Sequence, residues 1–292
     1  MNRVWLFMRS CLLGLGLGLT VSSTALLAQT SAAPSHSVPD DWDALMQVTS
    51  IETTLQQIPN YFKNGLTQAI AQGAPIPPAA QMALNAAAEE AYQFDHLREM
   101  ARAHLSSSLS AEQLARWLAF YRSPLGQKLS AADARAASPE FQVQLMARGP
   151  QVLETLSRDP SRMALLQAWL QATDALEQVT NMALQTQLAL EWGLISTMPQ
   201  PMGKPTFQEM QSHFEGQRFA MRAQMAQFIL AYAAAAYQDF SLEELGQLLS
   251  QANAPDAKAL HLDFSRKLYQ TLAALGEKTG QLAGRKLAQQ PV

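Results

Sequence analysis

The stretch SLSAEQLARWLAFYRSPLGQKL, residues 108–129, decides the fold because it holds two helix starts in succession. Ser110 is followed three residues later by Gln113, the spacing of a capping box at a helix N-terminus. Ser123 and Pro124 repeat the start signal, since serine accepts a hydrogen bond from an unpaired backbone N–H and proline fits the first helical position. The stretch therefore predicts two consecutive helices that meet at the Ser-Pro pair.

The same device recurs at Ser138-Pro139 and at Asp159-Pro160, which predicts further helix starts near residues 139 and 160. Ala, Leu, Gln and Met are abundant, whereas glycine and β-branched residues are sparse, and this mixture favours helix. No segment shows the alternation of a β-strand. The sequence therefore predicts an all-α protein, a helical bundle.

The spacing of apolar residues along the chain predicts the first helices. A helix is expected from about Asp41, with Pro59 as a kink and 73–78 as its end, and a second long helix is expected over 79–106. The apolar stripe of the first helix comprises Trp42, Leu45, Val48, Ile51, Leu55 and Ile58.

An internal repeat indicates two related units. DALMQVT at 43–49 returns as DALEQVT at 174–180, which is 131 positions later, and Ser110, Pro124 and Leu129 meet Ser241, Pro255 and Leu260 at the same offset. We predict helical repeat 1 over 41–158, helical repeat 2 over 159–285 and a tail over 286–292, with the repeats packed face to face because each is small for a stable core. Repeat 2 is expected to start on a long helix from Pro160, break at 198–205 and restart at Thr206 with a capping box.

The N-terminus is typical of a secretory signal. Arg3 and Arg9 precede an apolar run without charge, and Ala28 fits the position before a cut, with cleavage after Ala25 as the alternative. We assign residues 1–28 to a signal peptide and 29–40 to a disordered leader. An uncleaved membrane helix, which needs about 20 strongly apolar residues, remains the other reading. The signal predicts a periplasmic protein without a stable membrane span after cleavage.

Cysteine and charge restrict the function classes. The single cysteine, Cys11, lies in the signal, so the mature chain forms no disulfide and has no thiol nucleophile. The signal also removes two of the 21 basic residues, which leaves 19 against 24 acidic residues. This negative balance argues against a nucleic-acid partner.

The motif FYRSPLGQKL, residues 120–129, is the strongest candidate site. Ser123 as a nucleophile would need a base and an oxyanion hole, and no Gly-x-Ser-x-Gly elbow surrounds it. Its position as a helix cap explains it instead, and Gly126 would let another helix approach closely. We therefore interpret the motif as a structural corner, with an interaction site as its alternative role. The motif residues are Phe120, Tyr121, Ser123, Pro124 and Gly126.

The capped helix followed by FYRSPLGQKL, with two helices and a signal before it, resembles the bacterial exported proteins of domain-of-unknown-function family 2059. The resemblance is clear over Leu97 to Leu129 and faint in the second copy, which keeps only Pro255 and Leu260. It implies an all-helical exported protein. The family has no established activity, so the resemblance implies no catalytic residues.

Histidine and acidic residues are candidates for a metal site. In DHLREMARAH, Asp95 shares a helical face with Glu99, as does His96, but two ligands do not make a site. His213 near Glu215 and His261 near Asp263 are equally weak evidence for a metal site. We predict no metal and no cofactor, and a solvated charged face at residues 95–104.

A methionine and aromatic stripe runs along residues 207–232, and we expect it to be core between the repeats, with a partner or lipid groove as the alternative. Its members are Phe207, Met210, Phe214, Met221, Met225, Phe228, Ile229 and Tyr232. The sequence thus predicts a non-enzymatic binding or interaction module with an unknown protein partner in the cell envelope. The alternatives are a carrier of an apolar or lipid-like ligand in a cleft between the repeats and an envelope hydrolase.

Overall fold

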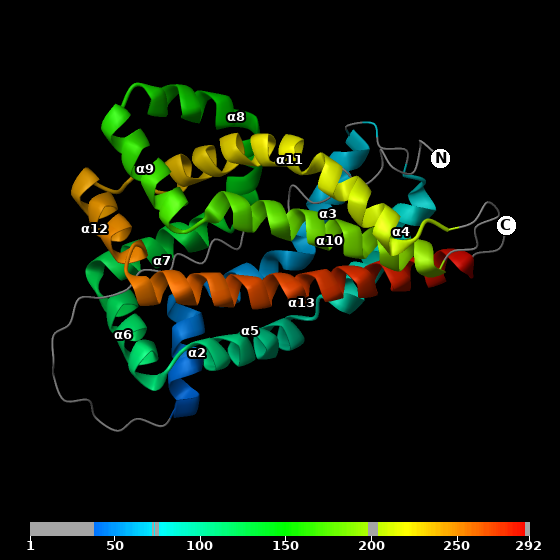
Figure 1. The fold of residues 1–292 in the computed structure, drawn as a ribbon, viewed down its shortest axis with the longest axis horizontal. Coiled ribbons are helices and arrows are strands. Elements are labelled where there is room, and N and C mark those ends of the chain that lie inside the picture. Colours follow the sequence, from blue (N-terminus) through cyan, green and yellow to red (C-terminus); the bar gives the residue numbers. More distant parts are fainter. Residues whose placement is uncertain (1–37, 72, 74–75, 198–203, 290–292) are drawn as a thin grey trace.

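The computed structural model describes residues 38–71, 73, 76–197 and 204–289, and within these ranges all regular secondary structure is α-helix (Figure 1). The all-α prediction is confirmed. The helices are α2 (Val38–Val48), α3 (Ile51–Ala71), α4 (Pro78–Ala91), α5 (Phe94–Ser108), α6 (Ala111–Arg122), α7 (Pro124–Ala136), α8 (Pro139–Ser157), α9 (Pro160–Ala172), α10 (Ala175–Thr197), α11 (Phe207–Ala236), α12 (Leu242–Ala252) and α13 (Pro255–Ala288).

The helix starts follow the predicted caps. Ser110 and Thr206 form complete capping boxes, and Ser123, Ser138 and Asp159 each accept a backbone N–H through the side chain. Proline occupies the first helical position after each of the last three. Local hydrogen-bond chemistry therefore sets these boundaries.

Three boundaries differ from the prediction. The helix expected from Asp41 breaks between α2 and α3, where Ser50 has φ of 57°, and the helix expected from Pro160 breaks at Asp174, with φ of 52°. The helix expected over 79–106 breaks at Tyr92, whose ring is buried against Phe62. None of these three residues is a glycine or a proline, the residue types that usually mark a helix break in a sequence.

The predicted ends of the ordered chain also differ slightly. Helix α2 begins at Val38, inside the predicted leader, and α13 runs to Ala288, inside the predicted tail. The predicted signal, residues 1–28, and the leader up to residue 37 lie outside the described residues.

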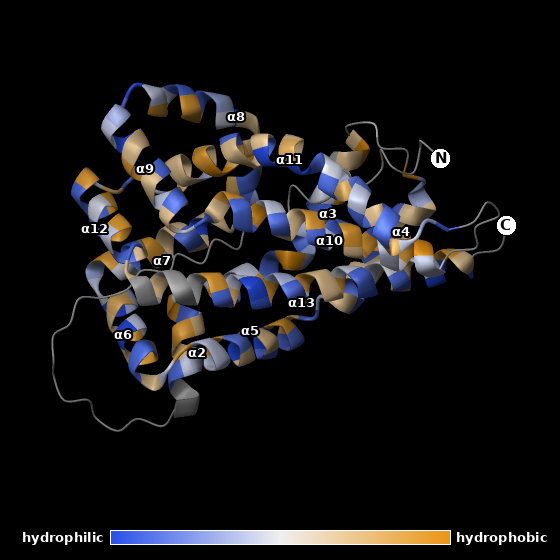
Figure 2. Ribbon diagram, viewed as in Figure 1, coloured by the Kyte–Doolittle hydropathy of each residue, from blue (hydrophilic) through white to orange (hydrophobic). Residues whose placement is uncertain are grey.

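One hydrophobic core passes through both predicted units, with members from Trp42 in α2 to Ala283 in α13. Helix α13 runs the length of the molecule beside α10 (Figure 1). It also packs on α4 and α5, while α11 packs on α7 and α8. Apolar and polar residues interleave along the helices in Figure 2, as expected where one face of each helix points inward.

The two halves share structural devices, some at the predicted offset of 131 residues and some at another offset. Thr49 and Thr173, 124 positions apart, each donate a side-chain hydrogen bond to a carbonyl four residues earlier, and each precedes a residue of positive φ. DALMQVT therefore ends at the helix break, whereas DALEQVT follows it. The offset of 131 holds for Ser110 and Ser241, which both cap helices with complete capping boxes. Duplication of the whole unit remains a prediction.

Candidate functional site

The motif at residues 120–129 forms the junction of α6 and α7. The Ser123 hydroxyl accepts a hydrogen bond from the Gly126 backbone nitrogen at 3.2 Å, and Pro124 begins α7. Phe120 and Tyr121 are buried, with their ring centroids 5.2 Å apart. The oxygen that a serine nucleophile would use is thus engaged in a helix cap.

Gly126 lies against the backbone of the preceding helix. A Cβ atom at this position would lie 2.1 Å from the Phe120 carbonyl oxygen and 2.6 Å from the Tyr121 Cα. Because both atoms belong to the main chain, a rotamer change cannot relieve the clash. Because glycine has no Cβ, it allows the start of α7 to lie this close to the end of α6.

Helix α7 is bonded to the end of α11 and the start of α12. The Lys128 ammonium contacts the Glu244 carboxylate at 2.6 Å and lies 4.8 Å from the centroid of the Phe240 ring. The buried Asp133 accepts a hydrogen bond from the Tyr237 hydroxyl at 2.8 Å. The motif helix, which belongs to predicted repeat 1, is therefore bonded directly to predicted repeat 2.

Two guanidinium groups bind the C-terminal end of α11. Arg135 donates to the Ala236 carbonyl at 2.8 Å, and Arg162 donates to the carbonyls of Tyr237 at 3.2 Å and Phe240 at 2.6 Å. Carbonyls at a helix C-terminus lack intrahelical partners and carry partial negative charge. Both arginines therefore have a structural role, because their positive charges are bonded to these carbonyls.

Helix α8 turns an apolar stripe toward solvent. Its inner face buries Leu145 and Leu156, whereas Val143 and Met146 are 66% and 47% exposed. Alternating steps of four and three residues place the outer positions on one line along the helix, away from Leu145. We call this line the α8 stripe, and it consists of Pro139, Val143, Met146, Pro150 and Leu153. Its three middle members are exposed, whereas the two end members, Pro139 and Leu153, are half-buried, and Leu153 also packs against the core.

A groove of about 410 Å³ lies between α8 and α11. Its apolar members come from both helices, and two arginines contribute charge. Arg148, which is exposed, has no ion-pair or hydrogen-bond partner among the described residues. The groove is lined by Arg135, Ser138, Glu140, Phe141, Gln144, Leu145, Arg148, Val152, Ala235 and Gln238.

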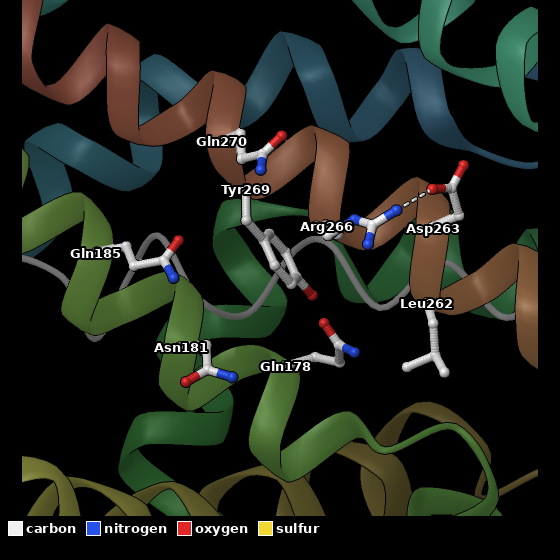
Figure 3. Close-up of a pocket in the computed structure, with 8 residues that line it drawn as sticks. All are labelled: Gln178, Asn181, Gln185, Leu262, Asp263, Arg266, Tyr269 and Gln270. Carbon is white, nitrogen blue, oxygen red and sulfur yellow. Dashed lines mark hydrogen bonds and ion pairs between the residues drawn. The ribbon is translucent and has the colours of Figure 1, made fainter.

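A second pocket, of about 530 Å³, lies between α10 and α13 and is lined mainly by polar side chains (Figure 3). The lining residues are Gln178, Asn181, Gln185, Leu262, Asp263, Arg266, Tyr269 and Gln270. No sequence argument singled out this pocket, because only the pairing of α10 with α13 brings its two sides together.

Beside this pocket, polar groups of α5 and α13 form a bonded cluster. The Asp263 carboxylate accepts from Ser108 at 2.6 Å and from Lys267 at 2.7 Å, and these bonds hold the pKa of the Asp263 carboxyl well below its usual range. His104 bonds to Thr271 at 2.8 Å rather than to Ser108. Because so acidic a carboxyl is a poor proton acceptor, this arrangement fits a bond between helices better than a catalytic base.

The predicted metal candidates do not converge. Asp95, His96 and Glu99 are exposed on α5, and His213 bonds to Gln217 on its own helix. The side chain of His261 lies outside the described ones. Across the part of the chain that the structure describes, no group of three or more His, Cys, Asp or Glu side chains is placed to hold a metal ion.

The core contains an acidic residue that sequence reasoning missed. Glu191 on α10 is only 4% exposed, and burial raises the pKa of its carboxyl to about 8. The Gln187 amide donates to it at 3.3 Å. The signal available in the sequence was a glutamate among the apolar residues Leu188, Leu194 and Ile195 of the same helix.

The methionine and aromatic stripe of α11 lies largely in the core. Met210, Phe214, Met225, Ile229 and Tyr232 are buried, and Met221 and Phe228 are partly buried. Phe207, at the start of the helix, is exposed but packs against Trp192. Core packing therefore accounts for most of the stripe.

Residues 95–155 match domain-of-unknown-function family 2059, described as an uncharacterized protein conserved in bacteria, and this match confirms the predicted resemblance. The segment runs from α5 almost to the end of α8, and so contains both the corner motif and the α8 stripe. No curated protein and no solved structure matches the chain. None of the described helices combines the length and the apolar character required to cross a bilayer.

Proposed function

We propose that this chain is an interaction module of the bacterial periplasm that binds a helix of a partner protein through the α8 stripe. The exposure of Val143 and Met146 supports the proposal, because α8 already buries its inner face and the stripe is additional apolar surface. A single exposed apolar side chain needs no explanation, but three aligned exposed ones, continued at both ends by half-buried apolar residues, are typical of an interface.

The spacing of the α8 stripe favours a helical partner. Steps of four and three residues average 3.5, which is the period at which two helices keep a common seam. Ala147 flanks the stripe near its middle and is exposed with only a methyl side chain, so a partner backbone can approach closely there. The stripe also lies within the segment that matches the family.

The periplasmic location is part of the proposal and rests on residues 1–28. The experiment that tests it is fractionation of cells that produce the full chain, followed by N-terminal sequencing of the soluble product. A periplasmic product that begins at Gln29 supports export. A cytoplasmic product that retains Arg3 and Arg9 contradicts it.

A photo-crosslinking amino acid at position 146 tests the α8 stripe in living cells, and the same amino acid at exposed Gln211 on α11 is the control. We expect one discrete adduct at position 146 that is absent at position 211 and is lost when Val143→Asp is added. Mass spectrometry should place the crosslink on the apolar face of a helix of the partner.

Several crosslinking results would contradict the proposal. No adduct, the same adducts at both positions, or a lipid adduct contradicts the proposal. An adduct of twice the mass of the chain would identify a homodimer and overturn the adaptor role. Because Val143 is exposed, Val143→Asp should leave the melting temperature within about 2 °C of wild type, since surface changes rarely exceed ±0.5 kcal/mol.

An apolar-ligand carrier is the second candidate, and the groove between α8 and α11 is the observation that favours it. This groove joins the two predicted units, has Phe141, Leu145 and Val152 among its lining residues, and includes the unpaired cation of Arg148. Native mass spectrometry of protein purified without detergent distinguishes the candidates. A bound lipid mass that is lost in Arg148→Glu supports the carrier, and a ligand-free mass contradicts it.

A further inference from the structure

The pocket between α10 and α13 has matched polar sides. Helix α10 contributes Gln178, Asn181 and Gln185, and α13 contributes Asp263, Arg266 and Gln270. Both sets follow the same spacing, a step of three residues and then a step of four, so each helix presents one line of polar groups. Figure 3 shows the two lines on either side of the Tyr269 ring, whose hydroxyl points toward Gln178.

The position of this pocket follows from glycine packing. Farther along both helices, a Cβ at Gly280 would lie 2.1 Å from the Leu190 carbonyl, and a Cβ at Gly276 would lie 3.1 Å from the Thr186 carbonyl. The two backbones therefore touch from residue 276 onward. The pocket lies before this contact, where both helices carry full side chains.

Three carboxamides of the pocket are available for a ligand. The side-chain amides of Gln178, Gln185 and Gln270 make no hydrogen bond to another residue in the described ranges. Asn181 uses its carbonyl oxygen to accept from Arg218 at 2.5 Å, and Arg266 donates to Asp263 at 2.5 Å. The two formal charges of the lining are thus paired, and the amides supply both donors and acceptors.

We propose that this pocket binds a neutral oligosaccharide. A hydroxyl group both donates and accepts a hydrogen bond, as a carboxamide does, so a row of carboxamides is complementary to a row of sugar hydroxyl or acetamido groups. The paired Asp263 and Arg266 disfavour a net charged ligand because either charge would have to leave its partner. A volume of about 530 Å³ is within the usual range of ligand sites.

This site is independent of the α8 stripe, since the two share no residue. The test is titration of the full chain with chitotriose and with maltotriose, followed by calorimetry and by protein-observed NMR. We expect saturable binding of at least one sugar. The double variant Gln185→Ala with Gln270→Ala should weaken binding at least tenfold.

The matched control is Gln208→Ala with Gln151→Ala, which removes two exposed carboxamides from α11 and α8 and should leave sugar binding unchanged. No binding of either sugar overturns the proposal, as does binding that the pocket variant leaves intact. Saturable binding of trialanine in place of both sugars overturns the ligand class. Val143→Asp should not alter sugar binding, so the two proposals fail separately.

Discussion

Substitution of Gly126 by alanine measures how tightly the corner is packed. The added Cβ would lie 2.1 Å from the Phe120 oxygen, whereas real Cβ atoms essentially never come within 3.0 Å of such an atom. Helices α6 and α7 must therefore move apart, and α7 is bonded to the second half of the molecule through Lys128, Asp133 and Arg135. Overpacking of this kind costs about 1–3 kcal/mol even where side chains can adjust, and here the obstacle is backbone.

The higher helix propensity of alanine opposes this destabilisation, and its contribution can be measured separately. Alanine is better than glycine in a helix interior by about 1 kcal/mol. Gly246 on α12 has open space around the position of a Cβ, so Gly246→Ala isolates this gain. We expect Gly246→Ala to raise the melting temperature and Gly126→Ala to lower it by several degrees, since 1 kcal/mol corresponds to about 2–4 °C in a protein of this size.

Differential scanning calorimetry and urea unfolding at neutral pH provide the readout. A melting temperature of Gly126→Ala equal to or above that of wild type, together with a higher value for Gly246→Ala, would refute the reasoning. Such a result would mean that the junction of α6 and α7 accommodates a methyl group with little loss of unfolding free energy. A circular-dichroism spectrum matching wild type verifies that both variants remain helical.

Three further predictions concern buried charge and helix ends. Burial raises the pKa of Glu191 to about 8, so the folded chain keeps a proton that the unfolded chain loses, and stability falls as the pH rises from about 4.5 to about 8. Glu191→Gln should raise the melting temperature at pH 8 and change it little at pH 4; equal shifts at both values would contradict the burial. Arg162→Met should cost about 1.5–3 kcal/mol in urea unfolding because it leaves the carbonyls of Tyr237 and Phe240 without their charged donor, whereas Arg158→Met, at an exposed i,i+4 pair, should cost at most about 0.5 kcal/mol. Tyr61→Phe removes a buried 2.6 Å bond to the Ala137 carbonyl and should lower the unfolding free energy by about 1 kcal/mol; an unchanged value would show that water replaces the hydroxyl.

The helix starts were readable from the sequence because they depend on short-range chemistry. Ser123, Ser138 and Asp159 each place a side-chain acceptor three residues before the N–H that they satisfy, and proline follows each one. Such signals need no knowledge of the rest of the fold. The class of the protein and the order of most helices followed from them.

The internal breaks were not readable in the same way. Ser50 and Asp174 take positive φ angles, which cost energy for residues with a Cβ, and neither is the glycine that usually signals such a turn. A threonine that bonds back to its own helix precedes both, which is a weak signal. The seven-residue match around 43–49 and 174–180 did not locate the breaks, because one copy ends just before Ser50 and the other begins at Asp174.

The pocket and the pairing of its helices required the three-dimensional structure. Gln178 and Gln270 are separated by most of the second half of the chain, and glutamine is common on solvated helices. The spacing of Gly276, Gly280 and Gly284, every fourth residue, was the available signal for a close helix pair. It indicates contact but does not identify α10 as the other helix.

The contacts of α7 connect the family segment to the second half of this protein, so we expect the segment to depend on that half for its stability. Asp133 and Arg135, inside the matched residues, bond to Tyr237 and Ala236, and Lys128 bonds to Glu244. Cut at the Arg158–Asp159 junction, each half would expose groups that only the other half can satisfy. Two such fragments, made as separate polypeptides, should be poorly ordered alone and should regain helical structure and a shared melting transition when mixed.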